Sequence, residues 1–230
     1  MNNPKFTAVI AAAGSGTRMG GVSKPNIKLL GKTLFEYVLL AINDSIIQNI
    51  VVVCSEDNKE SLIKLGKISD KPIKFVLGGK MRAESILNGI LAAEEDDCII
   101  CAHDCARPFI TSEMINQTCI LALEKGAACV CSPVIDTLKY KDPKNGTIYT
   151  PDRNNMFAVQ TPQCFKKDLY LKAKDFAGET FSSFTDETSI IENYGATVEY
   201  IRWQDTNIKL TAVDDVPIAE ILMQRRLNKK

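Results

Sequence analysis

The first loop of the chain combines glycines with two cations. Behind a short apolar run comes AAAGSGTRMGGVSKP (residues 11–25), which holds Gly14, Gly16, Arg18 and Lys24. Glycine has no Cβ and tolerates positive φ, so such a backbone can approach a ligand closely. Its exposed N–H groups attract anions, above all phosphates. The loop therefore predicts a binding site for a polyphosphate, with the two cations beside it.

Two other kinds of phosphate loop differ from this one in their spacing. A P-loop has the form G-x-x-x-x-G-K-[ST], and no Lys-Ser or Lys-Thr pair follows Gly14 or Gly16 at that distance. A dinucleotide-binding loop has the form G-x-G-x-x-G, and Met19 stands where its third glycine belongs. From these residues alone, an ordinary tight turn remains an alternative.

Three more cations and one acid complete the set of candidate residues. Arg107, Arg153 and Lys209 lie further along the chain, and Asp104 ends an apolar run. Phosphoryl transfer needs this composition, because its transition state concentrates negative charge that cations and a divalent metal neutralise. Asp104 is the candidate Mg²⁺ ligand, although it could also cap a turn or pair with Arg107. His103 is the single histidine, and we expect a hydrogen-bonded residue at a strand end rather than a general base.

The elements that must hold these residues alternate between strands and helices. Continuous apolar runs are typical of strands covered on both faces, and they occur at FTAVIAAA, NIVVVCS, IKFVLGG, DCIICAHD and AACVCSPV. Helical spacing of apolar residues separates these runs, at residues 34–42, 61–65, 83–93 and 114–123. The alternation predicts an α/β fold with a doubly wound, mostly parallel sheet, in one domain over residues 1–230. The carboxyl ends of the strands would bring the first loop, Gly79 and Asp104 to one edge.

The composition of the chain changes between Thr137 and Asp152. The segment TLKYKDPKNGTIYTPD is polar and carries Asn145 and Gly146 between two β-prone runs, which is a strong signal for a β-hairpin. A hairpin with so few apolar residues cannot bury itself. We therefore expect a protruding β-arm at about residues 135–156 that lies over the site or packs on another subunit.

Charge and cysteine content narrow the classes of partner and compartment. The chain has 28 basic and 28 acidic residues, so no global field would attract nucleic acid or an anionic membrane. No apolar run could span a membrane and the beginning lacks a leader pattern, so we expect a cytoplasmic protein. Of the eight cysteines, Cys98 and Cys101 form a C-x-x-C pair, but residues three apart on a strand point to opposite faces and cannot easily share a metal. We expect buried, reduced thiols.

Eight motifs follow one another across nearly the whole chain. They are AAAGSGTRMG, the lysine of VSKP, GGKMRAESILNGI, HDCARPF, IDTLKYK, DRNNMFAVQTPQCF, FTDETS and NIKLT. In this order they resemble the motifs of the 2-C-methyl-D-erythritol 4-phosphate cytidylyltransferases. The resemblance implies a nucleotidyltransferase (Rossmann-like) fold and a homodimer whose β-arms cross between subunits. It also implies a reaction of CTP with methylerythritol phosphate, with Mg²⁺ or another divalent metal, that gives CDP-methylerythritol and pyrophosphate in non-mevalonate isoprenoid synthesis.

The resemblance also implies roles for individual residues. Arg18, Lys24 and Lys209 would stabilise negative charge on the triphosphate, with Lys28 as the alternative to Lys24 because the motif around Lys24 departs from the family's. The residues implied to bind the nucleotide are Ala13, Gly14, Gly16, Gly79, Ser85 and Asp104, of which Asp104 would hold the metal. Those implied on the sugar-phosphate side are Arg107, Thr137, Arg153, Thr161 and Thr185, with Thr137 and Arg153 reaching the neighbouring subunit from the arm.

Three other functions stay open at this point. A ribitol-5-phosphate cytidylyltransferase shares the fold, CTP and most motifs, although AAAG and CARP lean toward the methylerythritol enzymes. A nucleotide-binding regulator without turnover would have no need of the cations and Asp104 together. A Rossmann dehydrogenase predicts a third glycine at position 19, which is Met19 here.

Overall fold

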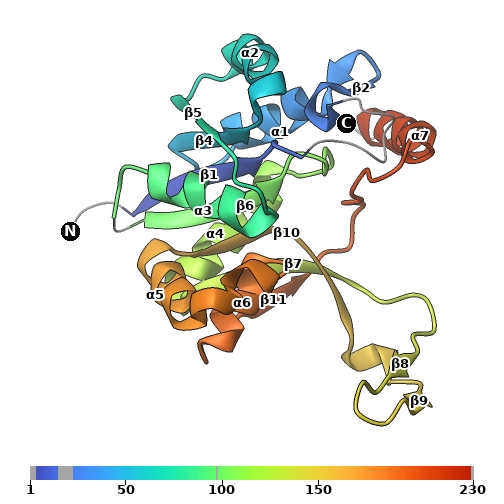
Figure 1. The fold of residues 1–230 in the computed structure, drawn as a ribbon. Coiled ribbons are helices and arrows are strands. Elements are labelled where there is room, and N and C mark those ends of the chain that lie inside the picture. Colours follow the sequence, from blue (N-terminus) through green and yellow to red (C-terminus); the bar gives the residue numbers. More distant parts are fainter. Residues whose placement is uncertain (1–3, 15–22, 97, 229–230) are drawn as a thin grey trace.

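A seven-stranded sheet forms the centre of the structure. This computed structural model describes residues 4–14, 23–96 and 98–228. The strand order is β11-β7-β10-β6-β1-β4-β5 (Figure 1), and the pairs are parallel except those that β10 makes with β6 and β7. The strands are β1 (Lys5–Ala11), β4 (Asn49–Cys54), β5 (Ile73–Leu77), β6 (Cys98–Asp104), β7 (Ala127–Pro133), β10 (Phe157–Lys166) and β11 (Glu199–Arg202). The predicted mostly parallel sheet is confirmed.

Apolar side chains alternate between the two faces of the sheet, as the period of a strand requires. In β1, Ala8 and Ile10 belong to the core on one face, where α1 (Leu34–Asn43) and α4 (Ser112–Lys125) pack. Val9 belongs to the core on the other face, which α3 (Arg82–Ala92), α5 (Lys167–Ala177) and α6 (Glu187–Asn193) cover. Helices therefore lie on both faces, as the alternation predicted (Figure 1).

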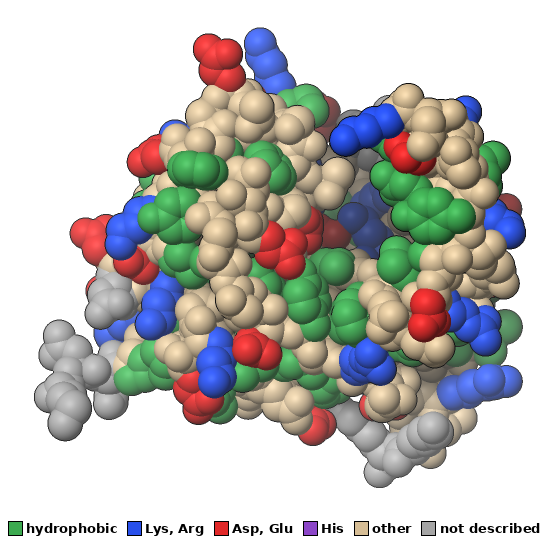
Figure 2. All heavy atoms as spheres, turned by 90° about the horizontal axis from the view of Figure 1, so that it is seen from below, with side chains coloured by type: hydrophobic (Ala, Val, Ile, Leu, Met, Phe, Trp, Pro, Cys, Tyr) green, Lys and Arg blue, Asp and Glu red, His purple; other side chains and the backbone are tan. Residues whose placement is uncertain are grey.

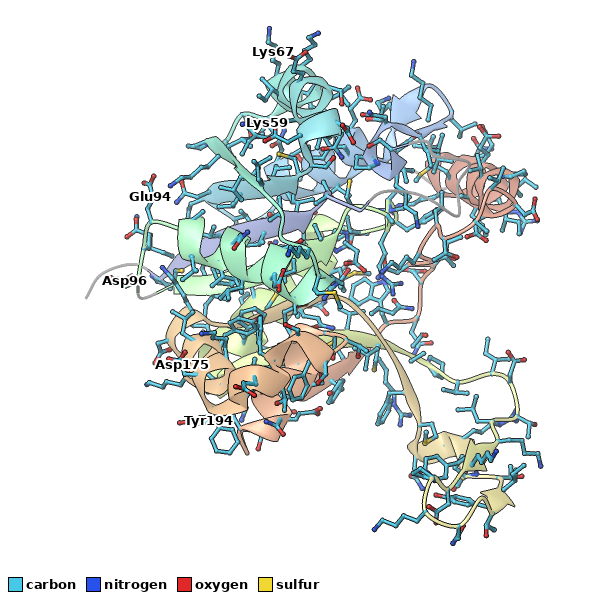
Figure 3. The ribbon with its side chains drawn as sticks, viewed as in Figure 1. Lys59, Lys67, Glu94, Asp96, Asp175 and Tyr194 are labelled. Atoms are coloured by element: carbon cyan, nitrogen blue, oxygen red, sulfur yellow. The ribbon has the colours of Figure 1, made fainter. Side chains whose placement is uncertain are left out.

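The remaining elements lie around this centre. They are α2 (Glu56–Leu65), α7 (Asp215–Leu227), the strand pair β2 (Lys28–Leu29) and β3 (Lys32–Thr33), and the 3₁₀ turns η2 (Lys24–Asn26), η3 (Gly66–Ile68), η4 (Arg153–Asn155) and η5 (Gly178–Ser183). The labelled charged side chains of Figure 3, such as Lys59, Glu94 and Asp175, lie on the outer side of the body and point outward. Among the helices in the described ranges, none has the length and apolar character needed to cross a membrane.

One glycine lets α3 lie close to the sheet. A Cβ at Gly89 would clash with Val9 Cγ1 and would lie only 2.7 Å from Val53 Cγ2. The helix therefore rests directly on β1 and β4. Its first residue, Arg82, is held in this way at the edge of the sheet where β1 and β6 end.

The arm between β7 and β10 projects from the body (Figure 1). Its strands β8 (Tyr140–Lys141) and β9 (Ile148–Tyr149) pair antiparallel, with Tyr140 opposite Tyr149 and Gly146 at a φ of +73° in the connecting turn. The predicted hairpin is confirmed. At its base, Arg153 Nη1 donates a hydrogen bond to the carbonyl oxygen of Ile135 (2.7 Å), which joins the outgoing and returning segments.

Candidate active site

The carboxyl ends of β1 and β6 open onto a cavity of about 460 Å³. The turn between β5 and α3 and the segment before α7 complete its walls. The face in Figure 2 is hollowed, with Lys or Arg atoms in the depth of the hollow. Seven predicted residues line the first cavity, which are Ala13, Gly14, Lys24, Gly79, Ser85, Asp104 and Lys209.

A second cavity of about 380 Å³ adjoins the first, between β10 and α6. Five predicted residues line it, which are Asp104, Arg107, Thr161, Thr185 and Lys209. Arg82, Asp104 and Lys209 line both cavities. Two ligands bound side by side would therefore meet at these three charged groups.

Asp104 lies at the boundary between the cavities with a cation on each carboxylate oxygen. Arg82 Nη2 is 3.1 Å from its Oδ1, and Lys209 Nζ is 2.6 Å from its Oδ2. Burial alone would raise the pKa of Asp104, but the charges of Arg82 and Lys209 more than reverse this and hold it well below its usual range. Asp104 is therefore a carboxylate throughout the physiological range of pH.

Arg82 is in turn fixed by a buried glutamate. Its Nη1 lies 2.7 Å from Glu187 Oε1 and its Nη2 lies 3.2 Å from Glu187 Oε2, so the contact is bidentate. The Glu187 side chain is only 1% exposed. Burial raises the pKa of Glu187, and the charge of Arg82 opposes that rise. The guanidinium thus spans two carboxylates, one of which faces the cavities.

The start of α6 is bound to β10 by a buried glutamine. Gln163 Oε1 accepts hydrogen bonds from the backbone N–H groups of Glu187 (3.0 Å) and Thr188 (3.1 Å). Gln163 Nε2 donates to Asp186 Oδ2 (2.8 Å), the residue that caps the helix. These bonds fix the place of Glu187 relative to the sheet, and through it the place of Arg82.

The turn between β5 and α3 is held by a separate set of hydrogen bonds. Ser85 Oγ accepts a hydrogen bond from the N–H of Gly79 (3.0 Å), and Glu84 Oε2 accepts from the N–H groups of Lys80 (2.8 Å) and Met81 (3.2 Å). A Cβ at Gly78 would lie 2.8 Å from the Cβ of Ala13, so this turn passes close to the end of β1. The predicted nucleotide residues Ala13, Gly79 and Ser85 are thus neighbours in space.

His103 connects the Asp104 loop to β10. Its Nε2 lies 3.1 Å from the carbonyl oxygen of Arg107, which can only accept, so Nε2 carries the proton. Its Nδ1 then accepts from the Thr161 hydroxyl (3.0 Å), whose oxygen accepts from the N–H of Asp104 (3.2 Å). Burial lowers the pKa of His103 to about 4, so the ring is neutral. The expectation of a hydrogen-bonded residue at a strand end is confirmed.

Comparison with known proteins identifies the family. A sequence model described as IspD, 2-C-methyl-D-erythritol 4-phosphate cytidylyltransferase, matches residues 6–225. The enzyme of that name from Clostridioides difficile is 35% identical over 223 residues, covering 95% of this chain and 93% of the relative. That of Caldanaerobacter subterraneus subsp. tengcongensis is 37% identical over 224 residues, covering 95% and 99%. The chain belongs to the 2-C-methyl-D-erythritol 4-phosphate cytidylyltransferase family.

Solved structures give the same answer for the fold. The crystal structure of 4-diphosphocytidyl-2C-methyl-D-erythritol synthase from Anaerococcus prevotii matches with a TM-score of 0.83 at 27% identity, and the match covers 96% of this chain and 99% of that one. The fold is therefore the α/β nucleotidyltransferase fold that the motifs implied, and the protein is an enzyme of the nucleotidyltransferase class. The regulator and dehydrogenase alternatives are not supported, and the relatives carry the methylerythritol name rather than the ribitol one.

Two cations near the first loop differ in position. Lys24 lines the first cavity, and its Nζ donates a hydrogen bond to the carbonyl oxygen of Leu210 (3.1 Å). Lys28, the alternative, is exposed on β2 and does not line the cavity. The geometry thus favours Lys24 as the family's first-loop lysine. Gly16 and Arg18 lie outside the described residues.

Arg107 does not form the ion pair with Asp104 that we considered as an alternative. Its Nη1 donates instead to the carbonyl oxygen of Asn207 (2.8 Å), which joins the Asp104 loop to the segment that carries Lys209. The Nε of Arg107 is buried and has no hydrogen-bond partner among the described residues, although the residue lines the second cavity.

The predicted arm residues lie elsewhere. Thr137 and Arg153 are exposed and line neither of the two cavities of their own chain. The sequence analysis did not predict Arg82 or Glu187 as site residues. Arg82 stands in the motif GGKMRAESILNGI and Glu187 stands in FTDETS. The signal for Arg82 was its position at the start of a helix, three residues after the Gly78-Gly79 pair. Glu187 gave no signal, because its partner is 105 residues away.

Proposed function

We propose that this enzyme transfers the cytidylyl group of CTP to 2-C-methyl-D-erythritol 4-phosphate and releases pyrophosphate. Membership of the family supports the pair of substrates. The observation that carries the proposal is the sharing of Arg82, Asp104 and Lys209 by two adjoining cavities. A reaction between two anions needs cations at the point where they meet.

Each substrate has a matching cavity. We assign the nucleotide to the first cavity, where Ala13, Gly14, Gly79 and Ser85 present a close backbone and a hydroxyl. Gly16 and Arg18 would extend this part of the site by their place in the first loop. The sugar phosphate belongs to the second cavity, which Arg107, Thr161 and Thr185 line together with further hydroxyl groups. This division leaves the α-phosphate of CTP and the phosphate of the acceptor at the shared charges.

The chemistry needs no covalent intermediate. A phosphate oxygen of the sugar phosphate attacks the α-phosphorus in line, the new P–O bond forms, and the bond to the bridging oxygen of the β-phosphate breaks, so pyrophosphate leaves. The attacking oxygen is already an anion and requires no general base. Lys24, Lys209 and Arg82 would hold the substrates and neutralise the charge that develops on the equatorial oxygens.

A divalent metal fits the residues around Asp104. Among the described residues that line the first cavity, Asp104 is the single acidic side chain. Mg²⁺ is commonly held by one or two carboxylates, with substrate phosphates and water as the other ligands. Each carboxylate oxygen has a second lone pair beside the one facing Arg82 or Lys209. Asp104 would hold the ion, which would supply positive charge beside the phosphates of CTP.

The arm suggests a homodimer. Four apolar side chains, Ile135, Tyr140, Ile148 and Tyr149, are between 46% and 82% exposed and gather on this one small arm, where a second surface could cover them together. We propose that the arm packs on a second copy of the chain and brings Thr137 and Arg153 to that copy's second cavity. The cysteines of the described residues are buried and form no disulfide, which is compatible with a reducing compartment, and we propose the cytoplasm.

Two experiments test this proposal. Pyrophosphate release is measured from CTP and Mg²⁺ with methylerythritol phosphate or ribitol 5-phosphate as the acceptor. Release with the first alone is expected, and release with the second alone would contradict the assignment.

For the dimer, an Arg153→Ala chain is mixed with an Asp104→Asn chain. If each site takes Asp104 from one chain and Arg153 from the other, mixing restores roughly a quarter of wild-type activity through hybrid dimers. No recovery would exclude a shared site.

A further inference from the structure

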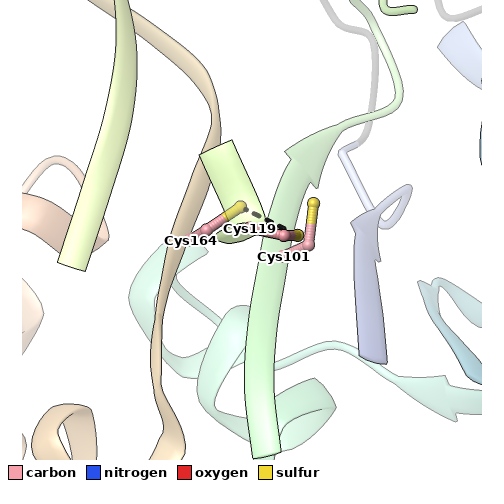
Figure 4. Close-up of side chains that lie close together, drawn as sticks. All are labelled: Cys101, Cys119 and Cys164. Atoms are coloured by element: carbon pink, nitrogen blue, oxygen red, sulfur yellow. Dashed lines mark hydrogen bonds between the residues drawn. The ribbon is translucent and has the colours of Figure 1, made fainter. Parts of the chain in front are cut away.

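Three cysteines from separate elements meet in the core (Figure 4). Cys101 of β6 and Cys164 of β10 stand directly opposite each other in the antiparallel ladder, and Cys119 comes from α4 above them. Their three Sγ atoms all lie within 4.8 Å of one another, and those of Cys119 and Cys164 are 3.5 Å apart. The proposed transfer reaction uses none of these thiols. One small atom could therefore contact all three sulfurs.

The surroundings of the three thiols restrict the charge that this place can hold. Each residue is at most 1% exposed, and the neighbours in this core are apolar, including Met114, Ile115 and Val130. Burial raises the pKa of the Cys164 thiol well above its usual value. Hydrogen bonds from the thiols of Cys119 and Cys164 lower the pKa of Cys101. An ionised group with uncompensated charge is costly in such an environment.

Charge and ligand number together select the kind of atom. Three thiolates around a monovalent soft metal leave two negative charges, and around a divalent one they leave one. Zinc also needs a fourth ligand for its tetrahedral geometry. The group of cysteine, histidine and acidic ligands within reach has three members among the described residues. A trivalent, three-coordinate centre with three thiolates is neutral and needs no other ligand.

We propose that Cys101, Cys119 and Cys164 form a binding site for a trivalent thiophilic oxyacid, with arsenite as its probe. Each thiol gives its proton to one hydroxyl group of As(OH)₃, that hydroxyl leaves as water, and an As–S bond takes its place. Three waters leave, the oxidation state of arsenic is unchanged, and the product in the core is uncharged. Because the thiols are buried, α4 must open from the sheet for entry, so binding is slow.

The test uses the reduced full-length chain under native conditions. The protein is incubated with arsenite and desalted, and arsenic per chain is measured by elemental analysis and by native mass spectrometry over time. We expect slow uptake of one arsenic per chain. Cys119→Ala abolishes this uptake, and Cys164→Ala repeats the test from a different element if the first variant does not fold. Circular dichroism checks the fold of each variant.

The matched control is Cys98→Ala. Cys98 is buried in the same strand, three residues from Cys101, but it belongs to the core on the opposite face. This variant is expected to take up arsenic like the wild type. Loss of uptake in Cys98→Ala would mean that cysteines close in sequence chelate arsenic in an opened chain, and it would overturn the proposal. So would unchanged uptake in Cys119→Ala, or no uptake by the folded wild type.

Discussion

Replacing Glu187 by glutamine is expected to slow the reaction although Glu187 faces neither phosphate directly. The substitution keeps the shape of the side chain and removes its charge. Arg82 would then lose the bidentate partner that aims its guanidinium at the boundary between the cavities. Glu187 is thus a positioning residue in this proposal, and its effect should pass entirely through Arg82.

The size of the effect follows from the contact. Removing one partner of a buried ion pair typically costs about 3–5 kcal/mol. Here the loss is smaller, because the Arg82 side chain is 33% exposed and keeps Asp104, and because glutamine still accepts one hydrogen bond. A loss of about 1–3 kcal/mol of transition-state stabilisation corresponds to a decrease in kcat of roughly 5- to 150-fold. The KM for CTP should change less, since the backbone contacts in the first cavity stay in place.

The assay is steady-state pyrophosphate release, combined with a double-mutant cycle. Glu187→Gln is compared with Arg82→Ala and with the double variant, and thermal unfolding is recorded for each. If Glu187 acts through Arg82, adding Glu187→Gln to Arg82→Ala lowers kcat little further. Multiplicative losses, or an unchanged kcat in Glu187→Gln alone, would refute the reasoning. Glu113→Gln, an exposed glutamate on α4 that lines neither cavity, serves as the matched control and should keep wild-type kinetics.

Three further outcomes follow from the site. Lys24→Ala should lower kcat by about 10²–10³-fold, as removal of one transition-state contact does. Lys28→Ala should leave kcat unchanged. Equal kinetics for the two variants would remove Lys24 from the mechanism. Arg153→Ala should raise the KM for the sugar phosphate more than that for CTP, and the opposite pattern would contradict the role of the arm. Burial lowers the pKa of His103 from 6.5 to about 4. Between these pH values the unfolded chain binds a proton at His103 that the folded chain does not bind. The free energy of unfolding should therefore fall by up to ~3 kcal/mol as the pH falls from 6.5 to 4. Denaturant melts of wild type and His103→Gln at both values check this, and an equal pH dependence in the two proteins would show that His103 is not the cause.

Most of the fold could be predicted, because a strand that is buried on both faces has a continuous run of apolar residues in the sequence. β4, β5, β6 and β7 lie within the apolar runs from which we predicted strands, and β1 begins one residue before its run. The antiparallel direction of β10 could not be predicted in this way. Its sequence, FAVQTPQCFK, contains two glutamines, a threonine and a proline, so it has no continuous apolar run of the kind that marks the parallel strands. Its direction follows from the long arm that precedes it rather than from local periodicity.

The candidate site was predictable only in part, for a different reason. A glycine or a cation in a loop can be recognised without knowing its partners, so Gly79, Lys24 and Lys209 could be found from the amino-acid sequence alone. The place of Arg82 in the site depends on its contacts with Asp104 and Glu187, which lie 22 and 105 residues away along the chain. Such pairs are created by the topology of the sheet, which brings the ends of separate elements to one edge. Sequence patterns with a fixed local period carry no information about them.

The four charged groups at the boundary of the cavities explain how the cations stay in place without a substrate. Arg82 and Lys209 contribute two positive charges, and Asp104 and Glu187 contribute two negative ones, so the cluster is neutral as a whole. Cations held by carboxylates need no reorganisation when an anion arrives, which is the condition for strong electrostatic stabilisation of a transition state. Loss of either carboxylate would leave an excess of positive charge and a mobile cation. We therefore propose that the acids are as necessary to the site as the cations, and that Glu187 acts on the reaction from outside both cavities.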